Sequence, residues 1–252
     1  MALGRWLGRK AETEAGASRP SIGVLGAFRS GTNYARALFE GNYDCEAVYH
    51  AYGWKHGFLP VLSPESPIEM PATPCVFVTK DPYAWLVSIH RYMLAVGRNI
   101  DAPEDWDAFL RSPFTVFVQF RGRGPEYRFP TPMDYWNGLN WNYRSAAQAG
   151  WPVRHLRYET VLGDPEGAIS TVADDLGLAR TSGTFAVPRN EVRRQGDDRG
   201  RIDGFETDRP FDAEAYASAS WRDRFSPEDV AFVSSRLDAD LMEGLGYSAA
   251  LP

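Results

Sequence analysis

The 252-residue sequence is poor in several residue types, and each shortage excludes a class of protein. It has only two cysteines, Cys45 and Cys75, which lie far apart beside apolar runs, so we expect buried thiols and no disulfide framework. Its four histidines show no paired spacing, which argues against a zinc site. No apolar run approaches the roughly 18 residues of a membrane span, and the N-terminus lacks a signal-peptide pattern. We therefore expect a cytoplasmic protein with no transmembrane segment, a flexible tail over residues 1–20 and one domain over 21–252.

Positive charge is also scarce. The chain has 27 Lys and Arg against 33 Asp and Glu, a net charge of −6, which argues against a nucleic-acid partner. Lysine itself occurs only at Lys10, Lys55 and Lys80. Because nearly every other cation is arginine, the few lysines mark positions where a compact ammonium is expected to matter.

Hydrophobic residues make up 44% of the chain and aromatic residues 13%, which is typical of a globular domain. Apolar runs predict strands at 22–25, 45–48, 75–79 and 153–157. Helical spacing and capping residues predict helices after residue 32, after Asp81, and over 101–111, 134–150, 165–176 and from Ser226 onward. Residues 112–133 are expected to be irregular and 180–210 to form a mobile loop. This alternation predicts an α/β fold, a single domain with a central, mainly parallel β-sheet flanked by helices.

The stretch I-G-V-L-G-A-F-R-S-G-T-N-Y, from Ile22 to Tyr34, predicts a strand, a turn and a helix start. Such a turn presents free backbone N–H groups and the positive end of a helix dipole, and Arg29 adds a guanidinium suited to phosphate oxygens. Thr32 and Asn33 stand where a Walker loop has its Lys and Ser/Thr. The loop is therefore expected to bind a phosphate without an ATP-type lysine, or else to be an ordinary turn.

Further polar residues follow the other predicted strands. Lys55 and His56 follow the second, Lys80 the third and Tyr158 the fourth, and parallel strands bring such positions to one edge of the sheet. Lys80 and Ser88 lie eight residues apart, at the start and in the second turn of the next helix, where they can hold a second phosphate. A nucleotide with phosphates at two ends fits this pattern.

Four patches together, spread over about residues 21–248, resemble the sulfotransferases that use 3′-phosphoadenosine 5′-phosphosulfate (PAPS), in their bacterial form. F-R-S-G-T-N-Y resembles the 5′-phosphosulfate loop, and Lys80-Asp-Pro with Ser88 resembles the 3′-phosphate motif, which usually begins with Arg. L-R-Y-E-T-V-L-G-D-P-E and W-R-D-R-F-S-P-E-D-V resemble two later family segments. The resemblance implies a P-loop-NTPase-like sulfotransferase fold, PAPS as donor with 3′-phosphoadenosine 5′-phosphate as product, and no metal requirement.

The resemblance also implies roles for individual residues. The loop residues that would bind the 5′-phosphosulfate are Arg29, Ser30, Gly31, Thr32 and Asn33, while Tyr34 and Tyr158 would border the adenine. His56, in W-K-H-G-F-L-P, is similar to the catalytic histidine of the family's K-T-H-x-P region and would act as the base, with Glu65 or Glu69 in reserve. Lys55 and Arg29 would stabilise the leaving phosphate. Arg193 or Arg194, in a loose match to the family's Arg-Lys-Gly, would close on the 3′-phosphate.

The acceptor remains open, because the composition of the predicted irregular segments fits a hydroxyl on a glycan, a lipid or a small molecule equally well. Two other functions compete with sulfuryl transfer. One is a kinase-like phosphotransferase on the same scaffold, which would need magnesium and ATP. The other is a catalytically silent nucleotide-binding module. Oligomeric state cannot be read from the sequence.

Overall fold

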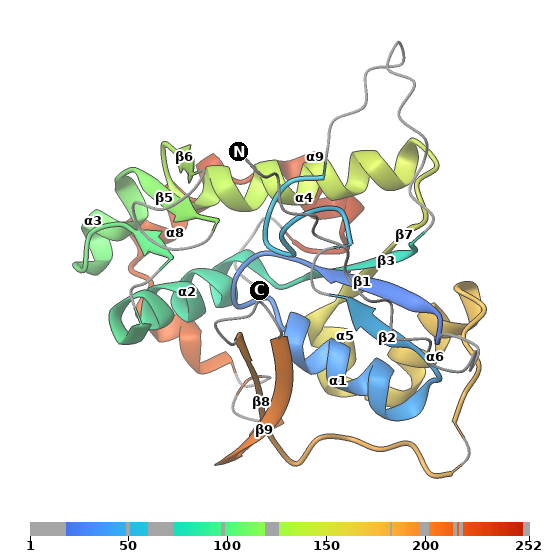
Figure 1. Cartoon of the computed structure of the whole chain (residues 1–252). Helices are drawn as coiled ribbons and strands as arrows, with labels where there is room; N and C mark the ends of the chain where they lie inside the picture. Colours follow the sequence, from blue (N-terminus) through green and yellow to red (C-terminus); the bar gives the residue numbers. More distant parts are fainter. Residues whose placement is uncertain are drawn as a thin grey trace, which may run out of the picture.

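The computed structural model describes residues 19–48, 51–59, 73–96, 99–118, 126–181, 183–196, 202–213, 216 and 219–248. For residues 192–196, 202–207 and 219 it describes the backbone path alone. Figure 1 shows a parallel sheet with helices on both faces, beside a small second sheet and a two-stranded hairpin. The predicted α/β class, with a mainly parallel central sheet flanked by helices, is confirmed.

The central sheet has four strands in the order β2-β1-β3-β7, and every neighbouring pair is parallel. Its strands are β1 (Ser21–Leu25), β2 (Glu46–Val48), β3 (Cys75–Thr79) and β7 (Val153–Arg157). All four lie where the apolar runs predict them. Because the strands are parallel, their carboxyl ends meet at one edge, which brings together the segments that carry the predicted site residues.

Side chains alternate across β3 into two separate cores. Cys75 and Phe77 belong to a cluster shared with the helices that follow β3 and precede β7 and with the C-terminal helix, while Val76 and Val78 belong to one shared with the helix after β1 and the two helices after β7. Both cysteines are buried free thiols, as predicted. The helices are α1 (Thr32–Asn42), α2 (Pro82–Val96), α3 (Trp106–Arg111), α4 (Pro132–Gln148), α5 (Tyr158–Gly163), α6 (Pro165–Asp175), η1 (Ala219–Arg224), α8 (Pro227–Arg236) and α9 (Ala239–Gly244).

Two segments expected to be irregular contain strands. Residues 112–133 include β5 (Phe114–Phe117) and β6 (Glu126–Phe129), which form an antiparallel sheet with β4 (Ile100–Asp101). The predicted loop 180–210 contains β8 (Asn190–Gly196) paired with β9 (Ile202–Pro210), next to α1 (Figure 1). The prediction failed for β5 and β6 because each is only four residues long, and for β8 and β9 because their sequences are polar and carry little hydrophobic periodicity.

Helix boundaries follow their caps. α3 begins only at Trp106, because the Asp105 side chain accepts a hydrogen bond from Ala108 N at 2.9 Å; Asp101, expected in this helix, belongs to β4. The last predicted helix is two helices, since Asp238 caps a new one by accepting from Leu241 N. α5, directly after β7, was not predicted. The caps at Asp81, Asp164 and Ser226 are confirmed.

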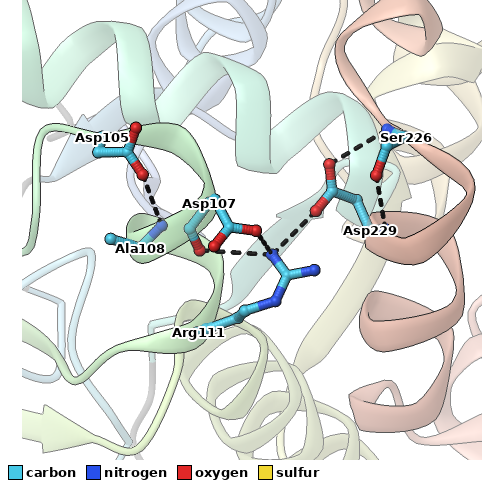
Figure 2. Close-up of polar contacts among 6 residues, drawn as sticks. All are labelled: Asp105, Asp107, Ala108, Arg111, Ser226 and Asp229. Carbon is cyan, nitrogen blue, oxygen red and sulfur yellow. Dashed lines mark hydrogen bonds and ion pairs between the residues drawn. The ribbon is translucent and has the colours of Figure 1, made fainter.

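One ion pair fastens α8 to α3 (Figure 2). Arg111 Nη1 lies 2.5 Å from Asp107 in its own helix and 2.9 Å from Asp229 Oδ1 in α8. Asp229 is buried and also accepts from Ser226 N at 3.1 Å, completing a capping box. Burial alone would raise the pKa of Asp229, but the hydrogen bonds from Arg111 and Ser226 hold it below its usual value. This pair therefore fixes the C-terminal helices against the body of the domain.

Candidate functional site

The loop after β1 takes a path that requires glycine at two positions. Gly26 (φ 154°) and Gly31 (φ 94°) have positive φ, and a Cβ on Gly31 would overlap the ring of Tyr158. Arg29, between them, is exposed and adopts a left-handed backbone (φ 64°), a conformation that costs a non-glycine residue free energy. Ser30 is buried, and its Oγ donates to Ala27 O at 2.8 Å. The loop is thus held in one strained shape at the start of α1.

Lys55 supplies this loop with an ammonium group. Its Nζ donates to Asn33 Oδ1 at 2.6 Å and to Thr32 Oγ1 at 3.2 Å, at the first turn of α1. The side chain is buried, and its backbone carbonyl accepts from Gly26 N at 3.0 Å. The lysine ammonium that the sequence of the loop lacks therefore comes from the segment after β2, and it lies next to the N-terminal end of a helix dipole.

His56 is packed against the same loop. Its Nδ1 lies 2.7 Å from Gly26 O, and its ring stacks on Phe28 at 4.2 Å, with Trp54 edge-on at 5.3 Å. Because a carbonyl can only accept, Nδ1 carries the proton and Nε2 is the proton acceptor of the ring. Burial, reinforced by the charges of Lys55 and Arg29, lowers the pKa of His56 well below its usual value. The imidazole is therefore neutral at pH 7.

Lys80 forms a second cationic centre, at the end of β3. Its Nζ donates to Ser88 Oγ at 2.6 Å, and lies 5.3 Å from the ring centre of Tyr158 and 5.6 Å from that of Tyr216. Its exposed fraction is only 4%. Burial lowers the pKa of Lys80 to about 8, although the nearby Glu159 carboxylate acts in the opposite direction. The structure thus brings Lys80 and Ser88 together as their spacing suggested.

The two rings beside this ammonium, Tyr158 and Tyr216, belong to a cluster of four aromatic rings. Tyr34 stacks on Phe211 at 4.4 Å, and Phe211 stacks on Tyr216 at 5.5 Å. Tyr158 meets both Tyr34 and Tyr216 edge-on, each at 6.4 Å. The two tyrosines predicted to border adenine are therefore neighbours, and both are buried. Phe211 and Tyr216 were missed, because nothing in the sequence between β9 and η1 indicates that this segment returns to the sheet edge.

A cavity of about 240 Å³ opens beside Lys80, between the start of α2, the end of β7 and the C-terminal segment. Its walls include Lys80, Arg157, Tyr158, Glu159, Tyr216 and Arg222. It therefore adjoins the second cationic centre and shares two of the four aromatic rings. Arg157, Glu159 and Arg222 were not singled out by the sequence patterns.

Some predicted residues cannot be placed in the site. Glu65 and Glu69 lie outside the described residues. Arg193 and Arg194 belong to β8, where they pair with Phe205 and Gly204 of β9, and only their backbone is described. Within the described ranges, no three His, Cys, Asp or Glu side chains gather in a group that could hold a metal ion. In the same part of the chain, no helix is long and apolar enough to cross a membrane.

The sequence matches no protein-family model and no curated protein. The resemblance to PAPS-dependent sulfotransferases therefore rests on the motifs and on the side chains that the fold brings to this edge.

Proposed function

We propose that the protein is a PAPS-dependent sulfotransferase with a P-loop-like sulfotransferase fold, acting in the cytoplasm on a hydroxyl group. The observation that carries the proposal is the presence of two cationic centres at one sheet edge. One is the Arg29–Asn33 loop with the Lys55 ammonium, and the other is Lys80 with Ser88. A single nucleotide with phosphates on its 5′ and 3′ positions accounts for both.

The residues present fit such a donor. Ammonium groups and the amides of a helix N-terminus bind phosphate oxygens, so the loop and Lys55 suit the 5′-phosphosulfate. Lys80 is a point charge, whereas the resembling family usually has the planar fork of Arg, and Ser88 adds a hydroxyl donor beside it. Tyr34 and Tyr158, which the resemblance places at the border of the adenine, lie beside each other at this edge.

When bound, PAPS supplies a sulfuryl group whose bond to the 5′-phosphate oxygen breaks as the acceptor oxygen bonds to sulfur. His56 accepts the acceptor's proton at Nε2, and the imidazolium that forms keeps its Nδ1–H bond to Gly26 O. Lys55 and Arg29 offset the negative charge that develops on the departing phosphate. A bound anion also counteracts these two cations, which raises the pKa of His56 toward a value suited to a base.

A kinase-like phosphotransferase is the second candidate, and one observation favours it. The Lys55 ammonium donates hydrogen bonds to Thr32 and Asn33. The folded loop therefore has a lysine beside it, although its own sequence contains none. Magnesium-dependent ATP turnover would establish this alternative. A silent nucleotide-binding module would instead bind the nucleotide and transfer nothing to any acceptor.

Calorimetry with 3′-phosphoadenosine 5′-phosphate tests the proposal first. We expect this nucleotide to bind clearly more tightly than 5′-AMP, because only the former engages both cationic centres. No binding at high micromolar concentration, or equal binding of the two nucleotides, would contradict the proposal. A screen of product masses with PAPS and glycan, lipid and phenolic acceptors would then identify the acceptor.

The role of His56 is tested by His56→Ala once an acceptor is known. We expect turnover to fall by at least about a hundredfold while nucleotide affinity is retained. The matched control is His90→Gln, since His90 is also buried but bonds to Glu104 O, away from the loop. Near-normal turnover of His56→Ala would assign the proton transfer to another group.

A further inference from the structure

The peptide group that follows Lys80 is held by side chains at both of its polar atoms. The carbonyl of Lys80 accepts a hydrogen bond from Trp136 Nε1 at 3.2 Å, and the N–H of Asp81 donates to Glu159 Oε1 at 2.8 Å. Because the peptide bond is planar, these two bonds together fix its orientation, and with it the direction in which the Lys80 side chain leaves the backbone. Glu159 therefore acts directly on the segment that carries the ammonium.

Glu159 is itself the end of a longer chain of hydrogen bonds. Its Oε2 accepts from the Tyr247 hydroxyl at 2.9 Å, and that hydroxyl lies 3.0 Å from Thr79 Oγ1. Thr79 Oγ1 in turn lies 2.7 Å from His155 Nε2. The four side chains come from β7, β3, the segment after α9 and the first turn of α5. One continuous path therefore joins the interior of the central sheet to the backbone of Asp81.

The protons of this chain have one arrangement. A carboxylate only accepts, so the single hydroxyl proton of Tyr247 goes to Glu159, and burial keeps that proton in place by raising the pKa of Tyr247 well above its usual value. Thr79 must then donate to Tyr247, which leaves Thr79 Oγ1 to accept from His155. The ring proton of His155 is therefore on Nε2, and the chain runs in one direction, from His155 to Glu159.

The surroundings of His155 agree with this arrangement. Burial, reinforced by the charge of Arg157, lowers the pKa of His155 to about 4, so the ring is neutral at pH 7 and carries one proton. The ring stacks on Phe77 at 4.7 Å. His56 holds its proton on the other nitrogen, Nδ1, because it donates to a carbonyl. The structure thus assigns opposite tautomers to two buried histidines, a difference that can be measured.

We propose that Glu159 is a positioning residue for the second cationic centre, one whose part in nucleotide binding rests on the function proposed above. It fixes the peptide after Lys80 and places a negative charge near the ammonium, while the chain from His155 holds its carboxylate in place. Glu159 and Lys80 line the same cavity, and the charge of Glu159 favours the ammonium form that burial disfavours. Without this carboxylate, Lys80 releases its proton at a lower pH and binds an anion less well.

NMR of the lysine side chains in the free protein tests this role. The chain has only three lysines, so a ¹³C label at Cε gives few signals, and loss of one in Lys80→Arg identifies that of Lys80. We expect this signal to titrate near pH 8 in the unaltered protein. In Glu159→Gln the midpoint should fall by about one pH unit or more, because a nearby opposite charge is lost.

Glu166→Gln is the matched control. Glu166 also lies in the first turn of a helix, but 54% of its side chain is exposed, and it pairs with Arg180. Its variant should leave the Lys80 midpoint unchanged. Both variants retain the other charged groups around Lys80, which are Asp81, Arg29 and Arg91 and, in the cavity walls, Arg157 and Arg222. An unmoved midpoint in Glu159→Gln would overturn the proposed role.

The direction of the chain is tested in the unaltered protein by ¹⁵N NMR of its histidines. We expect the proton of His155 on Nε2 and that of His56 on Nδ1. A proton on Nδ1 of His155 would contradict the chain and, with it, the way in which Glu159 is held. Because this measurement requires no variant, it decides even if thermal denaturation shows that Glu159→Gln does not fold.

Calorimetry at pH 8 then separates this proposal from the proposed function. If the midpoint falls to about pH 7, the charged fraction of Lys80 at pH 8 falls from half to about one tenth, so 3′-phosphoadenosine 5′-phosphate should bind about fivefold more weakly to Glu159→Gln. If the midpoint moves but the unaltered protein does not prefer this bisphosphate to 5′-AMP, the proposed function fails and the role of Glu159 stands. If that preference exists but the midpoint does not move, the role of Glu159 fails and the proposed function stands.

Discussion

If the protein binds the proposed nucleotide, Lys80 should make that binding depend on pH in a way that an arginine would not. Burial lowers the pKa of Lys80 to about 8. At pH 8 the Lys80 side chain is therefore neutral in half of the free protein molecules. A bound phosphate favours the ammonium form and raises its pKa. The phosphate itself is already a dianion at pH 8, since its second pKa is about 6.

The same shift affects folding. The unfolded chain holds the Lys80 proton up to a pKa of about 10.5, whereas the folded protein releases it near 8. Between these two values the unfolded state binds more protons, so the free energy of unfolding rises with pH. The charged ammonium therefore makes the free protein less stable at neutral pH, by about 3 kcal/mol. That penalty disappears as the pH rises from 8 to 10.5, and a bound anion relieves it at neutral pH.

Proton-linked calorimetry measures this coupling. Titrating 3′-phosphoadenosine 5′-phosphate at pH 8, in two buffers of different ionisation enthalpy, should show uptake of about half a proton. The affinity should then fall by up to about tenfold for each pH unit above 8. Lys80→Arg should bind without proton uptake and without this pH dependence, because arginine stays protonated.

Other groups contribute little to the proton uptake at pH 8. A bound anion raises the pKa of His56 from its lowered value, but a histidine that returns to its usual value of 6.5 is still neutral at pH 8. Burial raises the pKa of Tyr158, so this hydroxyl stays protonated. Equal proton uptake by the unaltered protein and Lys80→Arg would show that another group is responsible. The assignment of Lys80 to a phosphate would then be wrong.

Two further predictions concern the loop and the C-terminal helices. Gly31→Ala should abolish nucleotide binding in calorimetry, because a side chain at φ 94° is strained and its Cβ would overlap Tyr158. Arg111→Met should lower the free energy of unfolding by about 1–3 kcal/mol in urea denaturation, since it leaves the buried Asp229 carboxylate without its cation. The difference from the unaltered protein should shrink as the pH falls through the lowered pKa of Asp229 and the carboxylate is neutralised.

Each of these variants has a matched control. Gly41→Ala likewise adds a methyl group, within α1, but nothing lies within 4 Å of the new atom, so nucleotide binding should persist. Arg128→Met removes an exposed ion pair with Glu126 and should change the free energy of unfolding by less than about 1 kcal/mol. Loss of binding in Gly41→Ala, or equal destabilisation by the two arginine variants, would contradict the structural reasons given.

The sequence alone predicts the central sheet and the edge of that sheet where the candidate site lies. The continuous apolar run C-V-F-V-T marks β3 because both of its faces are covered, and the caps at Asp81 and Asp164 mark the following helices. Since parallel strands end at one edge, the sequence alone places Lys80 and Ser88 near the loop at Arg29.

Contacts between distant segments could not be predicted in the same way. The hydrogen bonds from Lys55 to Thr32 and Asn33 depend on the path that the chain takes after β2. No local sequence pattern predicts that path. The cavity wall formed by Tyr216 and Arg222 depends on the packing of a segment with weak periodicity. The β8–β9 hairpin was missed because its sequence is polar and carries little hydrophobic periodicity.

The bond between Tyr247 and Glu159 has a consequence for the order in which the protein is made. Glu159 holds the backbone of Asp81, next to Lys80, and is itself held by the Tyr247 hydroxyl, which also bonds to Thr79 at 3.0 Å. During translation the central sheet and the loop leave the ribosome long before residue 247. The second cationic centre therefore acquires its final shape only when the last part of the domain has emerged and docked.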